Sequence, residues 1–372
     1  MKYKKGILLL LTAALLWGCG GREEIVFVAE PSGEESGGTV ENVNLNAGSF
    51  LSYEYITPTD VSPDQVVWVN VEPKRPQDRP LRVGFSQMEV NNDWRIYENA
   101  SIFQEAEALG IELLYRDAES SLEKQNADIL ELIEAGVDYL IVAPRQYFGL
   151  EGAFEAAREA GVPVILIDRL AAGTVGVDYV TCIMTDHVEV GSRAAGILAE
   201  QFPEQEICVL EVSGTTGSSS ASYLSEGFRK VAEERNWEII TVDGNFDRVD
   251  SLNVVQEALV TYGNDIDAVF AHIDDSAIGA IQAMRNVGLE PGTDTEAGEI
   301  PVVSMGGYKD ALKAIIAGDM LATIECSPRF GPIVFYYINC LEDAQRIRSR
   351  IVMPGKTYDI SNAGELIELE GY

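Results

Sequence analysis

The side chains in this chain that could do chemistry occur as short polar groups beside apolar runs. Asp168 and Arg169 directly follow the apolar run at 162–167, and Trp94 and Arg95 stand at the start of a helical pattern. A carboxylate and a guanidinium together accept and donate hydrogen bonds in fixed geometry, which suits hydroxyl groups. An indole ring adds a flat apolar face. The combination favours binding of a hydroxylated ring over a covalent reaction.

No group of residues has the spacing of a catalytic or metal site. The chain has two histidines, His187 and His272, and neither is placed to pair with a nucleophile or to share a metal. The adjacent carboxylates of Asp274 and Asp275 diverge from the backbone and are poorly placed to act as an acid–base pair. The glycine-containing run at 214–220 lacks the lysine of a phosphate-binding loop. We therefore expect no enzymatic activity, no metal and no cofactor.

The elements that position these residues follow a regular order from residue 81 to near the end of the chain. Short apolar runs alternate with amphipathic helical patterns, which predicts parallel strands connected by right-handed helical crossovers in two doubly wound α/β sheets. Ligands of such sheets bind beyond the carboxyl ends of the strands, where the polar groups stand. The predicted strands are 81–87, 111–116, 139–143, 162–167, 206–212, 238–242, 268–271, 301–304 and 321–325.

Four motifs, taken in order, resemble those of one family. They are Gly84-Phe85-Ser86-Gln87, Asn92-Asp93-Trp94-Arg95, Pro163-Val164-Ile165-Leu166-Ile167-Asp168-Arg169, and Asp274-Asp275 followed by Ile278-Gly279-Ala280-Ile281-Gln282-Ala283. Residues 81–372 thereby resemble the periplasmic sugar-binding proteins of ABC importers, of the ribose and galactose type with the LacI-like fold. The motifs are most similar to the galactofuranose-binding branch.

The resemblance implies a type I periplasmic binding protein, in which two doubly wound parallel-sheet lobes are joined by a hinge. The N-terminal lobe is expected at 81–185 plus 327–347, and the C-terminal lobe at 186–326 plus 348–372. Hinge strands are expected near 185–187, near Cys326 and near the end of 342–350. A ligand would bind between the lobes and favour their closed arrangement.

The resemblance also implies which side chains contact the ligand. From the first lobe these are Gln87, Asn92, Trp94, Arg95, Asp168 and Arg169, and from the second they are Ser222, Asn245, Phe246 and Asp274. The second lobe departs from the family at three positions. Close relatives have an asparagine where this chain has Ile273 and an aspartate where it has Gly306, and ribose-type relatives have an arginine at Ser222. A changed ligand, a derivatised sugar and weakened binding are all compatible with these departures.

The N-terminus has the pattern of an exported lipoprotein. Lys2, Lys4 and Lys5 precede an uncharged, leucine-rich run that ends at Gly18, just before Cys19. We expect a signal peptide at 1–18, a lipidated Cys19, and a lipid-anchored acidic tether with a short extension at 19–80. The protein would then lie in the periplasm or on the outer face of the cytoplasmic membrane, held there by its acyl chains.

Charge and cysteine content narrow the partners further. The formal net charge of −33 and the absence of a basic stripe exclude nucleic acid as a partner. The later cysteines have no metal-binding spacing, and their even number allows three disulfide pairings among Cys182, Cys208, Cys326 and Cys340.

Three functions are compatible with these observations. The first is a binding protein that delivers a sugar or sugar derivative to the permease of an ABC importer. The second is a sensory binding protein that signals its ligand state to a chemoreceptor or histidine kinase in the membrane. The third, a remote alternative, is a glycosidase-like enzyme, which would need two carboxylates facing one cleft.

Overall fold

The computed structural model describes residues 11–14, 24–27, 68–69 and 79–372. Cys19 and most of the predicted signal peptide and tether lie outside the described residues. Strands β1 (Leu11–Ala14) and β2 (Glu24–Phe27) pair antiparallel. Among the described residues, no helix has the length and apolar character needed to cross a membrane.

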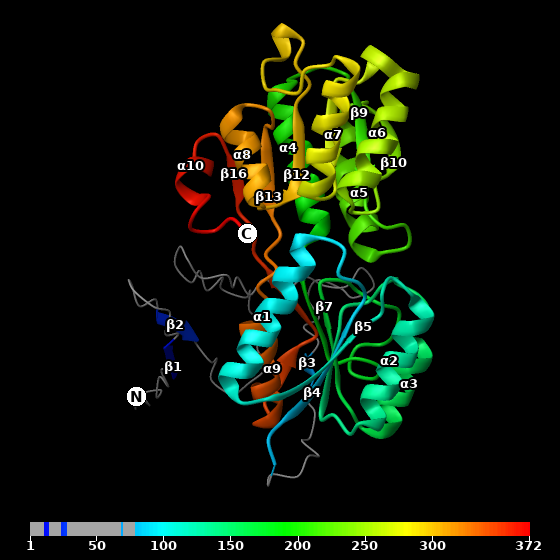
Figure 1. Ribbon diagram of the computed structural model, residues 1–372, viewed down its shortest axis with the longest axis vertical. Coiled ribbons are helices and arrows are strands. Elements are labelled where there is room, and N and C mark those ends of the chain that lie inside the picture. Colours follow the sequence, from blue (N-terminus) through cyan, green and yellow to red (C-terminus); the bar gives the residue numbers. More distant parts are fainter. Residues whose placement is uncertain (1–10, 15–23, 28–67, 70–78) are drawn as a thin grey trace, which may run out of the picture.

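Two α/β lobes are stacked along the long axis of the molecule (Figure 1). The lower lobe in this view contains a six-stranded sheet whose neighbouring strands all run parallel, in the order β15-β8-β7-β6-β4-β5. Every residue of β6 and β7 is buried, as expected for strands covered on both faces. The strands are β4 (Arg82–Gln87), β5 (Glu112–Asp117), β6 (Tyr139–Val142), β7 (Val164–Ile167), β8 (Thr181–Thr185) and β15 (Arg350–Met353). The helices are α1 (Asp93–Leu109), α2 (Leu122–Glu134), α3 (Glu151–Ala160) and α9 (Gly331–Glu342).

The upper lobe repeats this design with the strand order β10-β9-β11-β12-β13-β16, in which only β16 is antiparallel to its neighbour. Its strands are β9 (Cys208–Ser213), β10 (Glu238–Asp243), β11 (Ala268–Ala271), β12 (Val302–Gly306), β13 (Ala322–Glu325) and β16 (Thr357–Asp359). Its helices are α4 (His187–Gln201), α5 (Ser219–Glu234), α6 (Arg248–Tyr262), α7 (Asp274–Val287), α8 (Lys309–Ala317) and α10 (Ala363–Leu366), with short 3-10 turns η1 (Gly263–Asp265) and η2 (Thr295–Ala297). The predicted architecture of two doubly wound lobes is confirmed.

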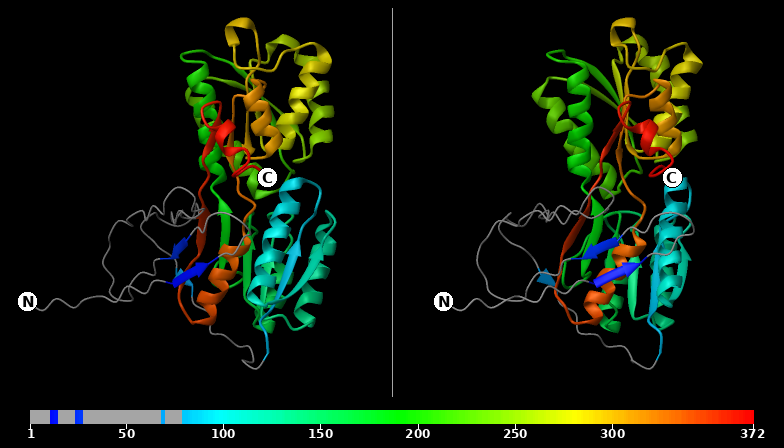
Figure 2. Two further views of the ribbon diagram at one scale, coloured as in Figure 1. Left: turned by 60° about the vertical axis from the view of Figure 1, so that its left-hand side comes forward. Right: turned by 90° about the vertical axis from the view of Figure 1, so that its left-hand side faces the viewer.

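The chain passes between the lobes three times, as Figure 2 makes visible from two sides. The first crossing is at Asp186 between β8 and α4, the second runs through 326–330 between β13 and α9, and the third runs through 354–356 between β15 and β16. The expected boundary placed residues 348–372 in the second lobe. Instead β15 pairs in parallel with β8, so the third crossing follows Met353. The cause is the apolar character of β15, whose residues are all buried in the first sheet. A short strand before it, β14 (Ile347–Arg348), pairs with β3 (Trp68–Val69).

Two glycines set the close packing of α4 on α5, the helices that begin beside the junction of the lobes. A Cβ at Gly227 would lie 1.9 Å from the carbonyl oxygen of Val188, and one at Gly191 would lie 2.2 Å from that of Leu224. The two backbones therefore touch where a larger residue would hold them apart. This contact holds the start of α4, which includes His187, against the middle of α5.

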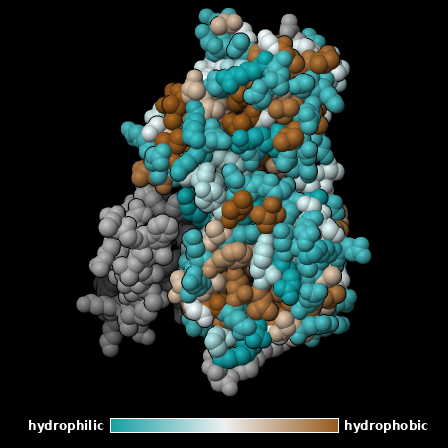
Figure 3. All heavy atoms as spheres, viewed as in Figure 1, coloured by the Kyte–Doolittle hydropathy of each residue, from teal (hydrophilic) through white to brown (hydrophobic). Residues whose placement is uncertain are grey.

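Hydrophilic residues cover most of the face seen in Figure 3, with hydrophobic patches on both lobes. Large apolar side chains such as Phe85, Phe228 and Phe270 are fully buried inside the lobes. The four cysteines of the lobes, Cys182, Cys208, Cys326 and Cys340, are free thiols. Disulfides therefore do not hold these lobes together, and apolar burial is the main source of their stability.

Candidate ligand-binding site

A cavity lies between the lobes, at the carboxyl ends of the strands. Its volume of about 20 Å³ is far smaller than the ~300–1,000 Å³ of pockets that hold small molecules. The first lobe contributes Asn92, Trp94, Arg95, Asp168 and Arg169, the crossings contribute His187 and Cys326, and the second lobe contributes Ser220, Phe246, Ile273, Met305 and Gly306. In this arrangement the two walls are closed against each other.

A buried group of charges forms the first-lobe wall. Arg95 Nη2 lies 2.5 Å from Asp168 Oδ2, and its Nη1 lies 2.8 Å from Glu98 Oε2. Arg169 Nε lies 3.3 Å from the same oxygen of Asp168. All four side chains are almost completely buried, so each charge depends on these partners instead of water.

The pKa values of these groups follow from burial and mutual attraction. Burial raises the pKa of Asp168, but the charges of Arg95 and Arg169 lower it by more, so the pKa lies below its usual value. Burial lowers the pKa of Arg95, and Asp168 and Glu98 more than reverse that effect. Burial and the charge of Arg95 lower the pKa of Arg169 to about 10. Burial raises the pKa of Glu98 despite its contact with Arg95. At neutral pH, Asp168 and both arginines are charged.

The backbone at Asp168 directs its side chain into the site. Asp168 has φ 64, a left-handed conformation that few residues other than glycine adopt. The turn after β7 is tight, with the N–H of Arg169 donating to Ile167 O at 2.6 Å. Such backbone conformations gather at ligand sites because the surrounding structure must hold them in place.

Aromatic rings flank the charges from both lobes. Arg169 Cζ lies 5.2 Å from the ring centroid of Phe246, so this cation–π contact joins the first lobe to the second. Phe246 has φ 56 and packs directly on Gly214, where a Cβ would lie 1.9 Å from the ring. Any other residue at position 214 would displace Phe246. The site therefore depends on this glycine for the position of its second-lobe ring.

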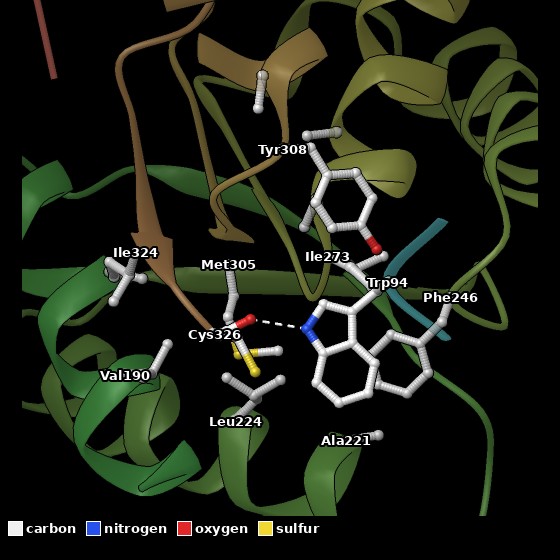
Figure 4. Packing of buried hydrophobic residues seen from close by; sticks show 14 of the residues in the cluster. Trp94, Val190, Ala221, Leu224, Phe246, Ile273, Met305, Tyr308, Ile324 and Cys326 are labelled. Carbon is white, nitrogen blue, oxygen red and sulfur yellow. Dashed lines mark hydrogen bonds between the residues drawn. The ribbon is translucent and has the colours of Figure 1, made fainter. Parts of the chain in front are cut away.

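Trp94 forms the other side of the cavity. Its Nε1 donates to Cys326 O at 2.6 Å, drawn as the dashed line in Figure 4, where Phe246 and Ile273 lie beside the indole. Arg95 Cζ lies 4.7 Å from the centroid of the Trp94 ring. The hydrogen bond connects the indole, which belongs to the first lobe, to the second crossing of the chain. Trp94 is therefore held in place by both the first lobe and the hinge.

The second-lobe wall is apolar. Phe246, Ile273, Met305 and Gly306 make up most of it, and Ser220 is the one polar side chain that this lobe adds to the lining. Ile273 occupies the N-cap position of α7 and makes no side-chain cap hydrogen bond. Serine, threonine, asparagine and aspartate are the residues that stabilise this position, so an isoleucine here serves packing at the cavity instead of the helix.

His187 lines the cavity at the first crossing and is completely buried. Neither of its ring nitrogens has a hydrogen-bond partner in the described part of the chain. Burial lowers its pKa to about 4, so the imidazole is neutral and has one donor and one acceptor to offer. Unpaired buried polar atoms are rare in folded proteins, and one beside a cavity is a natural ligand contact.

Asp274 is the predicted site residue that the structure places most differently. Its carboxylate accepts hydrogen bonds from Thr323 Oγ1 at 2.6 Å, from the N–H groups of Gly307 at 2.6 Å and Tyr308 at 2.8 Å, and from Ser304 Oγ. Burial outweighs these bonds and raises its pKa to about 6. Because its partners belong to β12, to β13 and to the segment between β12 and α8, Asp274 connects these elements of the second lobe and does not line the cavity.

Three other predicted residues also lie off the cavity. Gln87 stands behind it and donates from Nε2 to Glu98 Oε2 at 2.8 Å, so it supports the buried charges. The hydroxyl of Ser222 donates to its own helix. Asn245 is half-buried and donates to Asp250 at 3.3 Å. The remaining predicted residues, Asn92, Trp94, Arg95, Asp168, Arg169 and Phe246, all line the cavity.

Sequence reasoning missed His187, Ser220, Met305 and Cys326 as lining residues. Met305 and Cys326 follow or end predicted strands, so the rule of strand carboxyl ends could have found them. His187 was set aside because it has no partner at catalytic spacing. No sequence signal marks Ser220 among its neighbouring serines. Within the described ranges, no cluster of histidine, cysteine and carboxylate side chains suits a metal ion.

Comparison with known protein families gives a match over residues 83–329, to a family described as periplasmic binding protein domain. The chain belongs to the periplasmic binding proteins. It is similar to the galactofuranose-binding protein of Escherichia coli K12, with 33% identity over 258 residues that cover 68% of this chain and 80% of the relative. The ribose import binding protein of Bacillus subtilis 168 is 32% identical over 251 residues, or 67% and 77% of the two chains.

The fold of this periplasmic binding protein also matches solved structures. The crystal structure of a galactofuranose binding protein superposes with a TM-score of 0.74 and 30% identity, covering 78% of this chain and 98% of that one. The resemblance stated from the sequence motifs is thereby confirmed. These relatives are binding proteins, which agrees with the expectation that the chain is not an enzyme.

Proposed function

We propose that this chain is an extracytoplasmic solute-binding lipoprotein. It captures a sugar or sugar-like ligand between its lobes and delivers it to the permease of an ABC importer. No catalytic step takes part, because the cavity offers hydrogen-bonding and stacking groups and its one carboxylate, Asp168, is paired with arginines.

One observation carries this proposal: charged and aromatic side chains converge on an interlobe cavity. Arg95, Asp168 and Arg169 offer fixed donors and acceptors for hydroxyl groups, and Trp94 and Phe246 offer faces for the C–H surface of a sugar ring. The similar galactofuranose-binding and ribose import binding proteins support the same ligand class.

The ligand enters when the lobes separate. The closed cavity of about 20 Å³ has room for a water molecule and none for a sugar ring. Opening breaks contacts that join the lobes directly, such as the N–H of Tyr147 donating to Gly217 O at 3.0 Å and the N–H of Leu170 donating to Ser219 Oγ at 2.9 Å. A ligand held by both walls favours closure by its differential affinity for the closed state.

The test is a thermal-shift screen of the purified full chain against aldopentoses, aldohexoses, their deoxy derivatives, sugar acids and inositols. A ligand that binds only the folded state stabilises it by mass action and so raises the Tm. At a ligand concentration one hundred times Kd, the gain in the free energy of unfolding is about 2.7 kcal/mol. Asp168→Asn should abolish the shift, measured against that variant's own unliganded Tm. Glu155→Gln, at an exposed ion pair, is the matched control and should keep the shift. No shift with any sugar would contradict the proposal.

The membrane attachment rests on the sequence around Cys19 and has its own test. Cells expressing the full chain should incorporate labelled palmitate into it, and Cys19→Ala should abolish the label and release the protein from the membrane fraction. Cys340→Ala, which changes a cysteine inside the first lobe, should leave the label in place.

Delivery to an importer predicts that cells lacking the protein lose uptake of the ligand found in the screen.

A further inference from the structure

We propose that the ligand is a deoxy sugar, with hydroxyls along one edge and C–H groups in place of hydroxyls along the other. This inference rests on the proposed function and names the substrate class of the same site. The hydroxylated edge lies against the first lobe and the hinge, and the deoxy edge lies against the second lobe. The two walls of the cavity differ in chemistry in the way that such a ligand requires.

The first-lobe wall is rich in hydrogen-bonding groups. Asn92, Arg95, Asp168 and Arg169 line it, and Asp168 lies close enough to both arginines for a carboxylate and a guanidinium to bind the same hydroxyl. His187 extends this wall at the hinge, and its two ring nitrogens have no partner among the described residues. A hydroxyl that both donates and accepts would satisfy a neutral imidazole.

The second-lobe wall has almost nothing to offer a hydroxyl. Its side chains at Phe246, Ile273 and Met305 are apolar, and Ser220 Oγ is within hydrogen-bonding distance of another serine hydroxyl. The backbone is also used, because Gly306 O already accepts from the hydroxyl of Tyr372 at 2.8 Å and from a backbone N–H. A ligand hydroxyl pressed against this wall would lose its water and gain no partner.

Two local features show that this apolar wall is built into the fold. Ile273 stands at a helix N-cap, where asparagine or aspartate would stabilise α7, so apolar contact at the cavity is kept at the expense of the cap. At Gly306 a Cβ would lie 2.3 Å from Asp274 Oδ2, so no side chain can be added there without moving a buried carboxylate. A substitution at position 306 alone therefore cannot add an acidic hydroxyl partner to the wall without disturbing Asp274.

The expected preference is large enough to measure. A buried hydroxyl without a partner weakens binding by a penalty that corresponds to roughly 5- to 150-fold in Kd. A deoxy sugar should therefore bind at least about fivefold more tightly than the parent sugar that carries a hydroxyl at the same carbon.

The experiment measures Kd by isothermal titration calorimetry for parent and deoxy pairs with the full chain. The pairs are galactose with 2-deoxygalactose and 6-deoxygalactose, ribose with 2-deoxyribose and 5-deoxyribose, and arabinose with 5-deoxyarabinose. Tighter binding of one deoxy member by about fivefold or more supports the inference. Parent sugars that bind as tightly as all their deoxy partners overturn it and leave the proposed function intact. Failure of every sugar to bind overturns the proposed function itself.

A pair of substitutions tests whether Ile273 makes the preference. Ile273→Asn places an amide in the wall and is compatible with the N-cap, so it should tighten binding of the parent sugar about tenfold relative to the deoxy sugar. Ile273→Val keeps the wall apolar and should leave the ratio unchanged. A thermal melt of each variant confirms folding. An unchanged ratio in Ile273→Asn would overturn the assignment of the deoxy edge to this wall.

Discussion

Replacement of Asp168 by asparagine should destabilise the protein even without ligand. The change keeps the shape of the side chain, and asparagine tolerates the left-handed φ of 64 at this position, so backbone strain does not change. What is lost is the carboxylate that lies 2.5 Å from Arg95 and 3.3 Å from Arg169. Both arginines are nearly fully buried and cannot turn to water.

The magnitude follows from the cost of leaving a buried charge unpaired. Removing one partner of a buried ion pair typically destabilises a protein by about 3–5 kcal/mol. Glu98 still pairs with Arg95 at 2.8 Å, so the lower end, about 3 kcal/mol, is expected here. At about 2 °C per kcal/mol for a chain of this size, the Tm should fall by about 6 °C.

The assay is urea and thermal unfolding of the parent chain and Asp168→Asn, followed by circular dichroism at pH 7. Because the pKa of Asp168 lies below its usual range, the difference in stability should be constant from pH 5 to pH 8. Glu155→Gln removes an exposed partner of Arg158 and should change stability by less than about 0.5 kcal/mol. An Asp168→Asn protein within about 1 kcal/mol of the parent would refute the reasoning that these buried charges depend on one another.

Three further changes test other parts of the structure. Trp94→Phe removes the hydrogen bond to Cys326 O at 2.6 Å, and urea unfolding should report a loss of about 1 kcal/mol; an unchanged midpoint would mean that the bond does not stabilise the closed lobes. The buried carboxylate of Glu211 lies 3.1 Å from His272 Nε2. Burial raises the pKa of Glu211, but its contact with His272 and its hydrogen bonds to hydroxyls lower it by more, to about 2. Its depressed pKa gives roughly 3 kcal/mol of stability above pH 4.5 that is lost as the pH falls toward 2, so Glu211→Gln should flatten the acid unfolding curve in that window. Ser222→Ala should leave ligand affinity within twofold, because this hydroxyl bonds to its own helix and does not line the cavity. A larger change measured by calorimetry would mean that the hydroxyl contacts the ligand.

The fold could be predicted because most of its strands are buried apolar runs flanked by helical patterns. Each predicted strand corresponds to one in the structure, from β4 at 82–87 to β13 at 322–325. Within the two six-stranded sheets, the strands that were missed are β8, β15 and β16. No helix separates β7 from β8, and β15 and β16 are short runs near the third crossing. Alternation of strands with helices was the predictive signal, and it is absent where the chain passes between lobes.

More of the predicted residues line the cavity in the first lobe than in the second. Asp168 and Arg169 directly follow β7, so the end of a strand was enough to place them. Asp274 follows β11 by three residues, yet its side chain accepts hydrogen bonds from the N–H of Gly307 after β12 and from the hydroxyl of Thr323 in β13. Position along the strand predicts closeness to the cleft, but the direction of a side chain depends on neighbouring strands. That information is not present in the local sequence.

Because of the route that the chain takes between the lobes, one continuous stretch of sequence encodes the whole apolar wall. Ser220, Phe246, Ile273, Met305 and Gly306 all lie between the first crossing at Asp186 and the second at 326–330. The polar wall at 92–95 and 168–169 precedes that stretch entirely. A chimera that takes only residues 188–325 from a relative, and so leaves His187 in place, would therefore change which edge chemistry is accepted while keeping the groups that hold the ligand's hydroxyls. Specificity and capture are encoded in separate stretches of one chain, and selection can alter one without rebuilding the other.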